Sequence, residues 1–73
     1  MKHDTTMQDG IRAALNALAR ILDQAAKDAA QAHSYMQRNE QNLAIGTLLP
    51  AVDAVERAAA LAKAVLAMHQ FRE

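Results

Sequence analysis

The sequence predicts an all-α fold, an antiparallel helical hairpin that dimerises into a four-helix bundle. Each half of the chain carries an apolar stripe at alternating spacings of four and three residues, and an alanine-rich composition with 3% aromatic residues favours helix over sheet. Such a stripe keeps one side of a helix facing a partner. The first stripe comprises Ile11, Leu15, Leu18, Leu22, Ala25, Ala29, Ala32 and Met36. The second comprises Ile45, Leu48, Val52, Val55, Ala59, Ala62, Leu66 and His69.

The length of the chain adds the expectation of self-association. A chain of 73 residues forms a single domain and buries only about 60% of the surface that its unfolded form exposes. Domains of this size usually gain stability from disulfides, a structural metal or oligomerisation. Because the sequence has no cysteine, disulfides and thiolate metal sites are excluded. We therefore expect a homodimer.

The first helix is expected to span about 6–37. Thr5, followed three residues later by an amide side chain, fits a capping box, and Asp9 is an alternative cap. Gly10 would cost about 1 kcal/mol inside a helix, so the turns before Ile11 could fray. No helix breaker follows until the polar run at 38–42.

The polar run Arg38-Asn39-Glu40-Gln41-Asn42 is the expected turn, at about 38–42. Asn39 can adopt the left-handed conformation that ends a helix, and either Asn39 or Asn42 can begin the next one. The run divides the chain into two arms of similar length, which an antiparallel hairpin requires.

The second helix is expected to span about 43–71, with one uncertainty at Pro50. Proline cannot donate a hydrogen bond to the carbonyl of Gly46, four residues earlier. The helix therefore either kinks there or starts near 46–50, with Thr47 as its cap and Pro50 in the first turn. A kinked long helix keeps Ile45 and Leu48 in the stripe, and we favour it.

A further apolar stripe on the second helix predicts the dimer interface. It runs beside the first at the same spacing, so that this helix is apolar on two faces, and one hairpin partner cannot cover both. A second copy of the hairpin would cover the remaining face. The residues expected in this dimer or partner interface are Ala54, Ala58, Leu61, Val65 and Met68, together with Phe71 and Tyr35.

The pattern of charge argues against nucleic acid and membrane partners. Eight basic residues balance eight acidic ones, and the two signs are interleaved, as in the i,i+4 pairs Asp23 with Lys27 and Asp53 with Arg57. A phosphate-binding surface needs a basic stripe, and a bilayer span needs about 20 apolar residues, neither of which the sequence contains. We expect a cytoplasmic protein.

Catalytic, cofactor and metal sites are not expected. The only serine, Ser34, falls on the predicted solvent face, and no paired carboxylates lie on an apolar wall. The start Met1-Lys2-His3 matches the amino-terminal motif that binds Cu(II) or Ni(II), but a third-position histidine is common by chance. His33 and His69 share no ligand spacing with another histidine. We expect a protein without enzyme activity.

Two resemblances bear on function. The stretch Asn42-Leu43-Ala44-Ile45-Gly46-Thr47-Leu48-Leu49-Pro50, with the alanine-rich helix ending at Met68-His69, resembles short uncharacterised proteins of prophages and mobile elements. That resemblance implies a small inhibitor or adaptor that binds a bacterial host protein. In architecture alone the chain also resembles the Rop family of plasmid copy-number regulators, which implies an RNA-binding dimer as the alternative.

Overall fold

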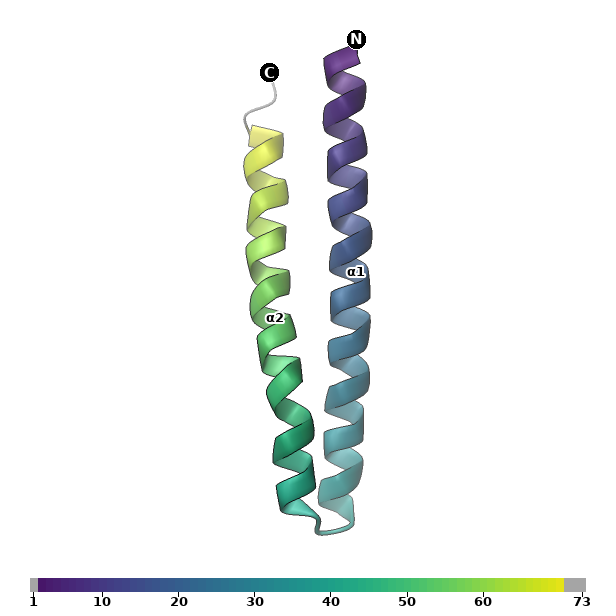
Figure 1. Cartoon of the computed structure of the whole chain (residues 1–73), viewed down its shortest axis with the longest axis vertical. Helices are drawn as coiled ribbons and strands as arrows, with labels where there is room; N and C mark the ends of the chain where they lie inside the picture. Colours follow the sequence, from purple (N-terminus) through teal and green to yellow (C-terminus); the bar gives the residue numbers. More distant parts are fainter. Residues whose placement is uncertain (1, 71–73) are drawn as a thin grey trace.

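Two antiparallel helices account for nearly the whole chain, so that the start of the first helix and the end of the second lie at the same end of the hairpin (Figure 1). The computed structural model describes the backbone of residues 2–70 and the side chains of residues 6–70. Helix α1 spans Lys2–Gln37 and helix α2 spans Gln41–Gln70. The predicted all-α hairpin is therefore confirmed.

Both helices start earlier in the chain than predicted, and the structure decides between the two alternatives at Pro50. Helix α1 is already helical at Lys2, so the predicted start at the Thr5 capping box is wrong, because no breaker precedes Gly10. Helix α2 begins at Gln41 and continues through Pro50, which excludes the alternative start near 46–50. The lost hydrogen bond at Pro50 costs less than ending the helix there, since the packed turns on both sides hold it in place.

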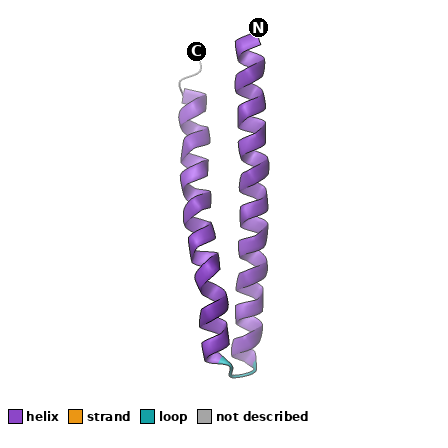
Figure 2. Ribbon diagram, viewed as in Figure 1, coloured by secondary structure: helices purple, strands orange, loops and turns teal. Residues whose placement is uncertain are grey.

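A tight turn of three residues joins the helices (Figure 2). Asn39 has a φ of 60°, the left-handed conformation predicted for it. The Asn39 N–H donates to the Met36 carbonyl at 2.9 Å, and the Glu40 N–H donates to the Tyr35 carbonyl at 2.9 Å. This pair of bonds is the Schellman motif, which satisfies the last carbonyls of α1. Helix α2 then starts with a bond from the Ala44 N–H to the Glu40 carbonyl, so Glu40 rather than either asparagine is its cap.

The core between the helices, here called the inner seam, is built from alanine. Among residues 6–70, the six buried hydrophobic residues are all alanines, and no large side chain is fully buried. They are Ala25 and Ala32 on α1, and Ala44, Ala51, Ala54 and Ala58 on α2. Half-buried residues extend the seam at heptad spacing; they are Met7, Ile11, Ala14, Leu18, Ile21, Asp28 and Tyr35 on α1 and Thr47, Leu61, Val65 and Met68 on α2.

The size of the seam residues changes along the hairpin. The buried alanines lie in the half nearest the turn and at mid-length, whereas leucine, isoleucine, valine and methionine fill the open half. Because the distance between helix axes follows the size of the side chains in contact, the helices approach more closely near the turn (Figure 1).

The hairpin is a thin rod that measures 57 × 14 × 12 Å. Its radius of gyration is 16.7 Å, against about 11 Å for a compact domain of this length. Two helices form only one contact line, so each keeps most of its circumference open to solvent. The face that each helix turns outward therefore matters more here than in a globular domain.

Candidate interaction surface

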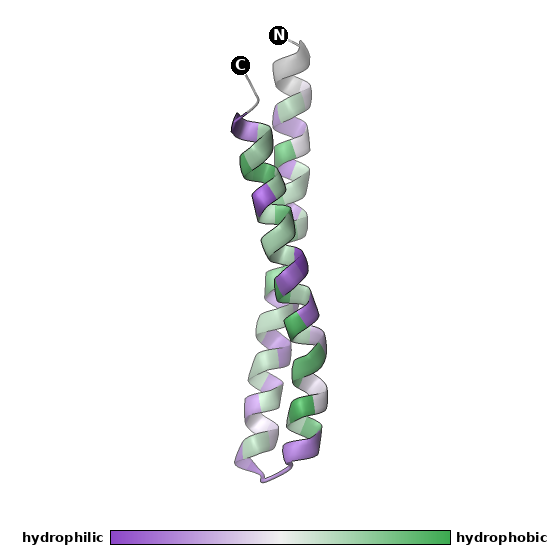
Figure 3. Cartoon of the chain, turned by 90° about the vertical axis from the view of Figure 1, so that its left-hand side faces the viewer, coloured by the Kyte–Doolittle hydropathy of each residue, from purple (hydrophilic) through white to green (hydrophobic). Residues whose placement is uncertain are grey.

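Large apolar side chains lie on one outward side of the hairpin. Among residues 6–70, eight of the ten exposed large hydrophobic residues form heptad-spaced rows on the two helices, and Leu43 and Leu49 lie outside these rows. The eight residues in the rows are Leu15, Leu22, Met36, Ile45, Leu48, Val52, Val55 and Leu66, and we call them the outer apolar face. Figure 3, which looks at α2 with α1 behind it, shows that α2 is hydrophobic along most of its length.

A shallow groove shows that the rows of the two helices lie on the same side. Ala25 and Ala29 of α1 line it together with Leu48, Val52 and Val55 of α2. Ala29 continues the row of Leu22, seven residues after it, so the small residues of α1 lie beside the large residues of α2 in this half. The outer apolar face is thus one surface shared by both helices.

The opposite side of the hairpin is polar. A second groove there is lined by Arg20, Gln24, Asp28, Pro50 and Arg57, with Ile21 and Ala54 at its floor. Gln24 Nε2 donates to Asp28 Oδ1 at 3.1 Å, which holds the carboxylate of this seam residue toward the polar side. The polar side chains of this groove therefore lie on the side of the hairpin away from the outer apolar face.

Basic side chains of the hairpin are largely neutralised by neighbouring acids. Lys27 lies 3.3 Å from Asp23, and Arg57 lies 3.4 Å from Asp53, which confirms the two predicted i,i+4 pairs. Arg12 pairs with Asp9 at 3.0 Å. These pairs are exposed and contribute little to stability, but they break up the positive charge along each helix.

Arg38 forms the fourth ion pair, at the turn. Its Nε lies 3.3 Å from Glu40, and its guanidinium lies 5.1 Å from the centre of the Tyr35 ring. The Tyr35 hydroxyl also accepts a hydrogen bond from Gln31 at 3.3 Å. Tyr35 is half-buried at the turn end of the inner seam, where these contacts fix it within its own hairpin.

The predicted interface residues face α1 rather than outward. Ala54 and Ala58 are 5% and 3% exposed in the hairpin alone, so they are buried against α1 and leave little surface for the interface between copies that the sequence predicted. Leu61, Val65 and Met68 continue the same row and are half-buried in the inner seam. Phe71 lies outside the described residues.

The row predicted to face α1 lies instead on the outer apolar face. On α2, all of its residues except Ala62 are exposed, and on α1 the exposed members are Leu15, Leu22, Ala29 and Met36. The small size of alanine explains why the buried and the exposed rows of α2 are the reverse of the prediction. A row of small residues lets two helix backbones approach closely, whereas bulky residues hold them apart. The heptad spacing of alanine on both helices was the sequence feature that could have predicted which rows are buried.

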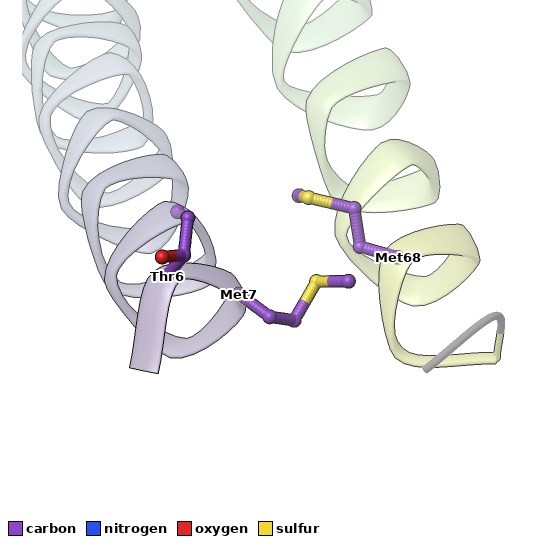
Figure 4. Close-up of a pocket in the computed structure, with 4 residues that line it drawn as sticks. Thr6, Met7 and Met68 are labelled. Atoms are coloured by element: carbon purple, nitrogen blue, oxygen red, sulfur yellow. The ribbon is translucent and has the colours of Figure 1, made fainter. Parts of the chain in front are cut away.

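The open end of the hairpin holds a methionine pair. The side chains of Met7 and Met68 point toward one another and line an open pocket with Thr6 and Gly10 (Figure 4). Within residues 6–70, no three or more histidine, cysteine, aspartate or glutamate side chains gather where they could hold a metal. The side chain of His3 lies outside the described residues.

Comparisons with known proteins give no relative. No family model, curated protein or solved structure matches the chain. The resemblance of the second arm to prophage proteins therefore stays a prediction. No helix among the described residues is long and apolar enough to span a bilayer.

Proposed function

We propose that the chain is a non-enzymatic protein-interaction module whose contact surface is the outer apolar face, and that a second copy of the chain covers this face to form a four-helix bundle. The observation that carries the proposal is the arrangement of side chains in the hairpin. Alanines are buried, while leucine, isoleucine and valine stay about half exposed along one side of both helices. Contiguous apolar surface of this kind marks a contact with another protein.

The exposed area fits a partner of similar size. A compact monomer of this mass exposes about 4,400 Å², whereas the hairpin exposes 5635 Å². The excess of about 1,200 Å² is larger than the roughly 800 Å² that each partner contributes to an interface of standard size. A second hairpin offers a face of the same length and character, and the zero net charge of the chain puts no repulsion between two copies.

The distribution of charge favours a protein partner over RNA. Phosphate binding requires unpaired basic side chains along one face, and its affinity falls steeply with salt. Arg12, Lys27, Arg38 and Arg57 each lie within 3.4 Å of a carboxylate. A surface with alternating signs has little net attraction for a polyanion.

The experiment is sedimentation equilibrium of the full chain over a range of micromolar concentrations. The proposal expects a mass of twice 7.9 kDa and a helical circular dichroism spectrum. A folded species that stays at the monomer mass would overturn it. Salt has little influence on an apolar interface, so we expect the dimer to persist at high ionic strength.

A further inference from the structure

We infer that the two copies cross antiparallel, with their turns at opposite ends, about a two-fold axis at the level of Ala19 and Ala59. In this arrangement Glu56 of each copy pairs with Lys63 of the other. The inference rests on the proposed homodimer and specifies its geometry. It assigns Glu56 and Lys63 as the residues that set the orientation of the dimer.

The level of the axis follows from the packing inside one hairpin. Ala25 packs against Ala51 and Ala54 in the inner seam. From this contact, six residues toward the open end of the hairpin lead to Ala19 on α1 and to residues 57–60 on α2, so these positions lie at the same level. Ala19 lies between Leu15 and Leu22 at heptad spacing, and Ala59 continues the row of Val55 in the same way, so both alanines lie within the outer apolar face and are exposed.

A two-fold axis through this level stacks each helix antiparallel on its own copy. Ala59 then faces Ala59, and Ala19 faces Ala19, so that the crossing points carry the smallest side chains. Moving outward along α2, Val55 lies opposite Ala62 and Val52 opposite Leu66. On α1, Leu15 lies opposite Leu22. The interface is self-complementary, as a two-fold contact must be.

Charges beside the face select this orientation. Glu56 and Lys63 lie on the outer flank of α2, two turns apart and at nearly equal distances from Ala59. The antiparallel crossing therefore brings Glu56 of one copy beside Lys63 of the other, twice per dimer. With both turns at the same end, α2 would instead lie on α1 of the other copy, which places Glu56 near Asp23 and Lys63 near Asn16. Like charges would then meet at Glu56 and Asp23, and Lys63 would lie opposite an uncharged side chain.

The same two residues have no ion-pair partner among the side chains of residues 6–70. The described ion pairs involve Asp9, Asp23, Glu40 and Asp53 as acids, and neither Glu56 nor Lys63 takes part in one. Glu56 also lines the rim of the apolar groove beside Val52 and Val55. Both charges are thus placed at the edge of the proposed interface and are free to pair across it.

Cysteine cross-linking tests the geometry directly, since the chain has no cysteine of its own. Ala59→Cys is expected to form a disulfide between copies under mild oxidation, and so is Ala19→Cys, because a two-fold axis brings each residue to its own copy. The matched control is Ala60→Cys, one position away on an exposed side of α2, which should stay reduced. A chain carrying both Ala19→Cys and Ala59→Cys reports the opposite orientation if digestion shows only bonds between residues 19 and 59.

Charge reversal tests the assigned pair. Glu56→Lys and Lys63→Glu alone should each weaken the dimer about three- to ten-fold, as expected for exposed ion pairs, and the double variant should regain the original affinity. Mixing the two single variants should give heterodimers in excess of the statistical fraction. The control mixes Asp53→Lys with Arg57→Glu, which carry the same net charges on the polar side. Equal heterodimer excess in both mixtures would overturn the assignment.

The outcomes separate the inference from the proposed function. A dimer whose disulfides join residue 19 to residue 59 overturns the antiparallel geometry and leaves the homodimer intact. A folded monomer that neither sediments as a dimer nor cross-links overturns both.

Discussion

Replacing Val52 by aspartate gives the sharpest test of the outer apolar face. Val52 is 48% exposed in the hairpin and lies in the middle of the row that runs from Ile45 to Leu66. In the proposed dimer its remaining surface is buried against Leu66 of the second copy. The substitution therefore leaves the inner seam untouched and acts on association.

The magnitude follows from the exposed fraction. Full burial of a valine side chain contributes about 1.5–3 kcal/mol, so the half that is still exposed at Val52 is worth about 1 kcal/mol per copy and about 2 kcal/mol per dimer. An unpaired carboxylate in an apolar interface costs at least about 1 kcal/mol more for each copy. Together these terms give at least about 4 kcal/mol, a dimer weaker by about 1,000-fold.

Sedimentation equilibrium of Val52→Asp beside Leu43→Asp measures this difference. Leu43 is a matched control, because it is 51% exposed but lies two turns before Pro50, on the polar side of α2. We expect Leu43→Asp to associate as the unmodified chain does and Val52→Asp to sediment as a monomer. If the two variants associate equally, the outer apolar face is not the contact surface.

Three further substitutions test the hairpin itself by thermal unfolding. Ala58→Leu should destabilise the fold by about 1–3 kcal/mol or more, because Ala58 is 3% exposed and the helices would be pushed apart. Ala60→Leu, at an exposed position, should be near neutral. Equal effects of the two substitutions would contradict the inner seam. Asn39→Ala should lower the free energy of unfolding by about 1 kcal/mol and Asn39→Gly should not, since φ is 60° at that residue. An unchanged unfolding midpoint for Asn39→Ala would argue against the left-handed cap. Gly46→Ala should stabilise α2 by about 0.5–1 kcal/mol, because an added Cβ meets no atom within 4 Å; a lower midpoint would indicate a contact at Gly46 that the single hairpin lacks.

The hairpin was predictable because its signals are local. Two heptad stripes set the helices, the polar run at 38–42 set the turn, and Asn39 took the conformation expected of an asparagine at a helix end. The continuation through Pro50 was the favoured alternative for the same reason, since the stripe persists on both sides of it.

The face that each helix buries was not predictable from hydrophobicity alone. Helix α2 carries two apolar stripes of identical spacing, so the pattern alone does not show which of them faces α1. The buried row of α1 was difficult to predict for a second reason. It includes Asp28 and Tyr35, whose polar groups form hydrogen bonds within their own helix. The size of the residues, rather than their hydrophobicity, decides which stripe lies inside.

Because the core consists of alanine, the register of the two helices depends mainly on the turn. Ala44, Ala51 and Ala58 are spaced by heptads, so sliding one arm by two helical turns would set another methyl group against Ala25 and change the packing little. The turn at Asn39 therefore sets the register between the two helices. Extra residues inserted there would yield a mixture of slipped hairpins, or arms exchanged between two chains, with the helical content almost unchanged.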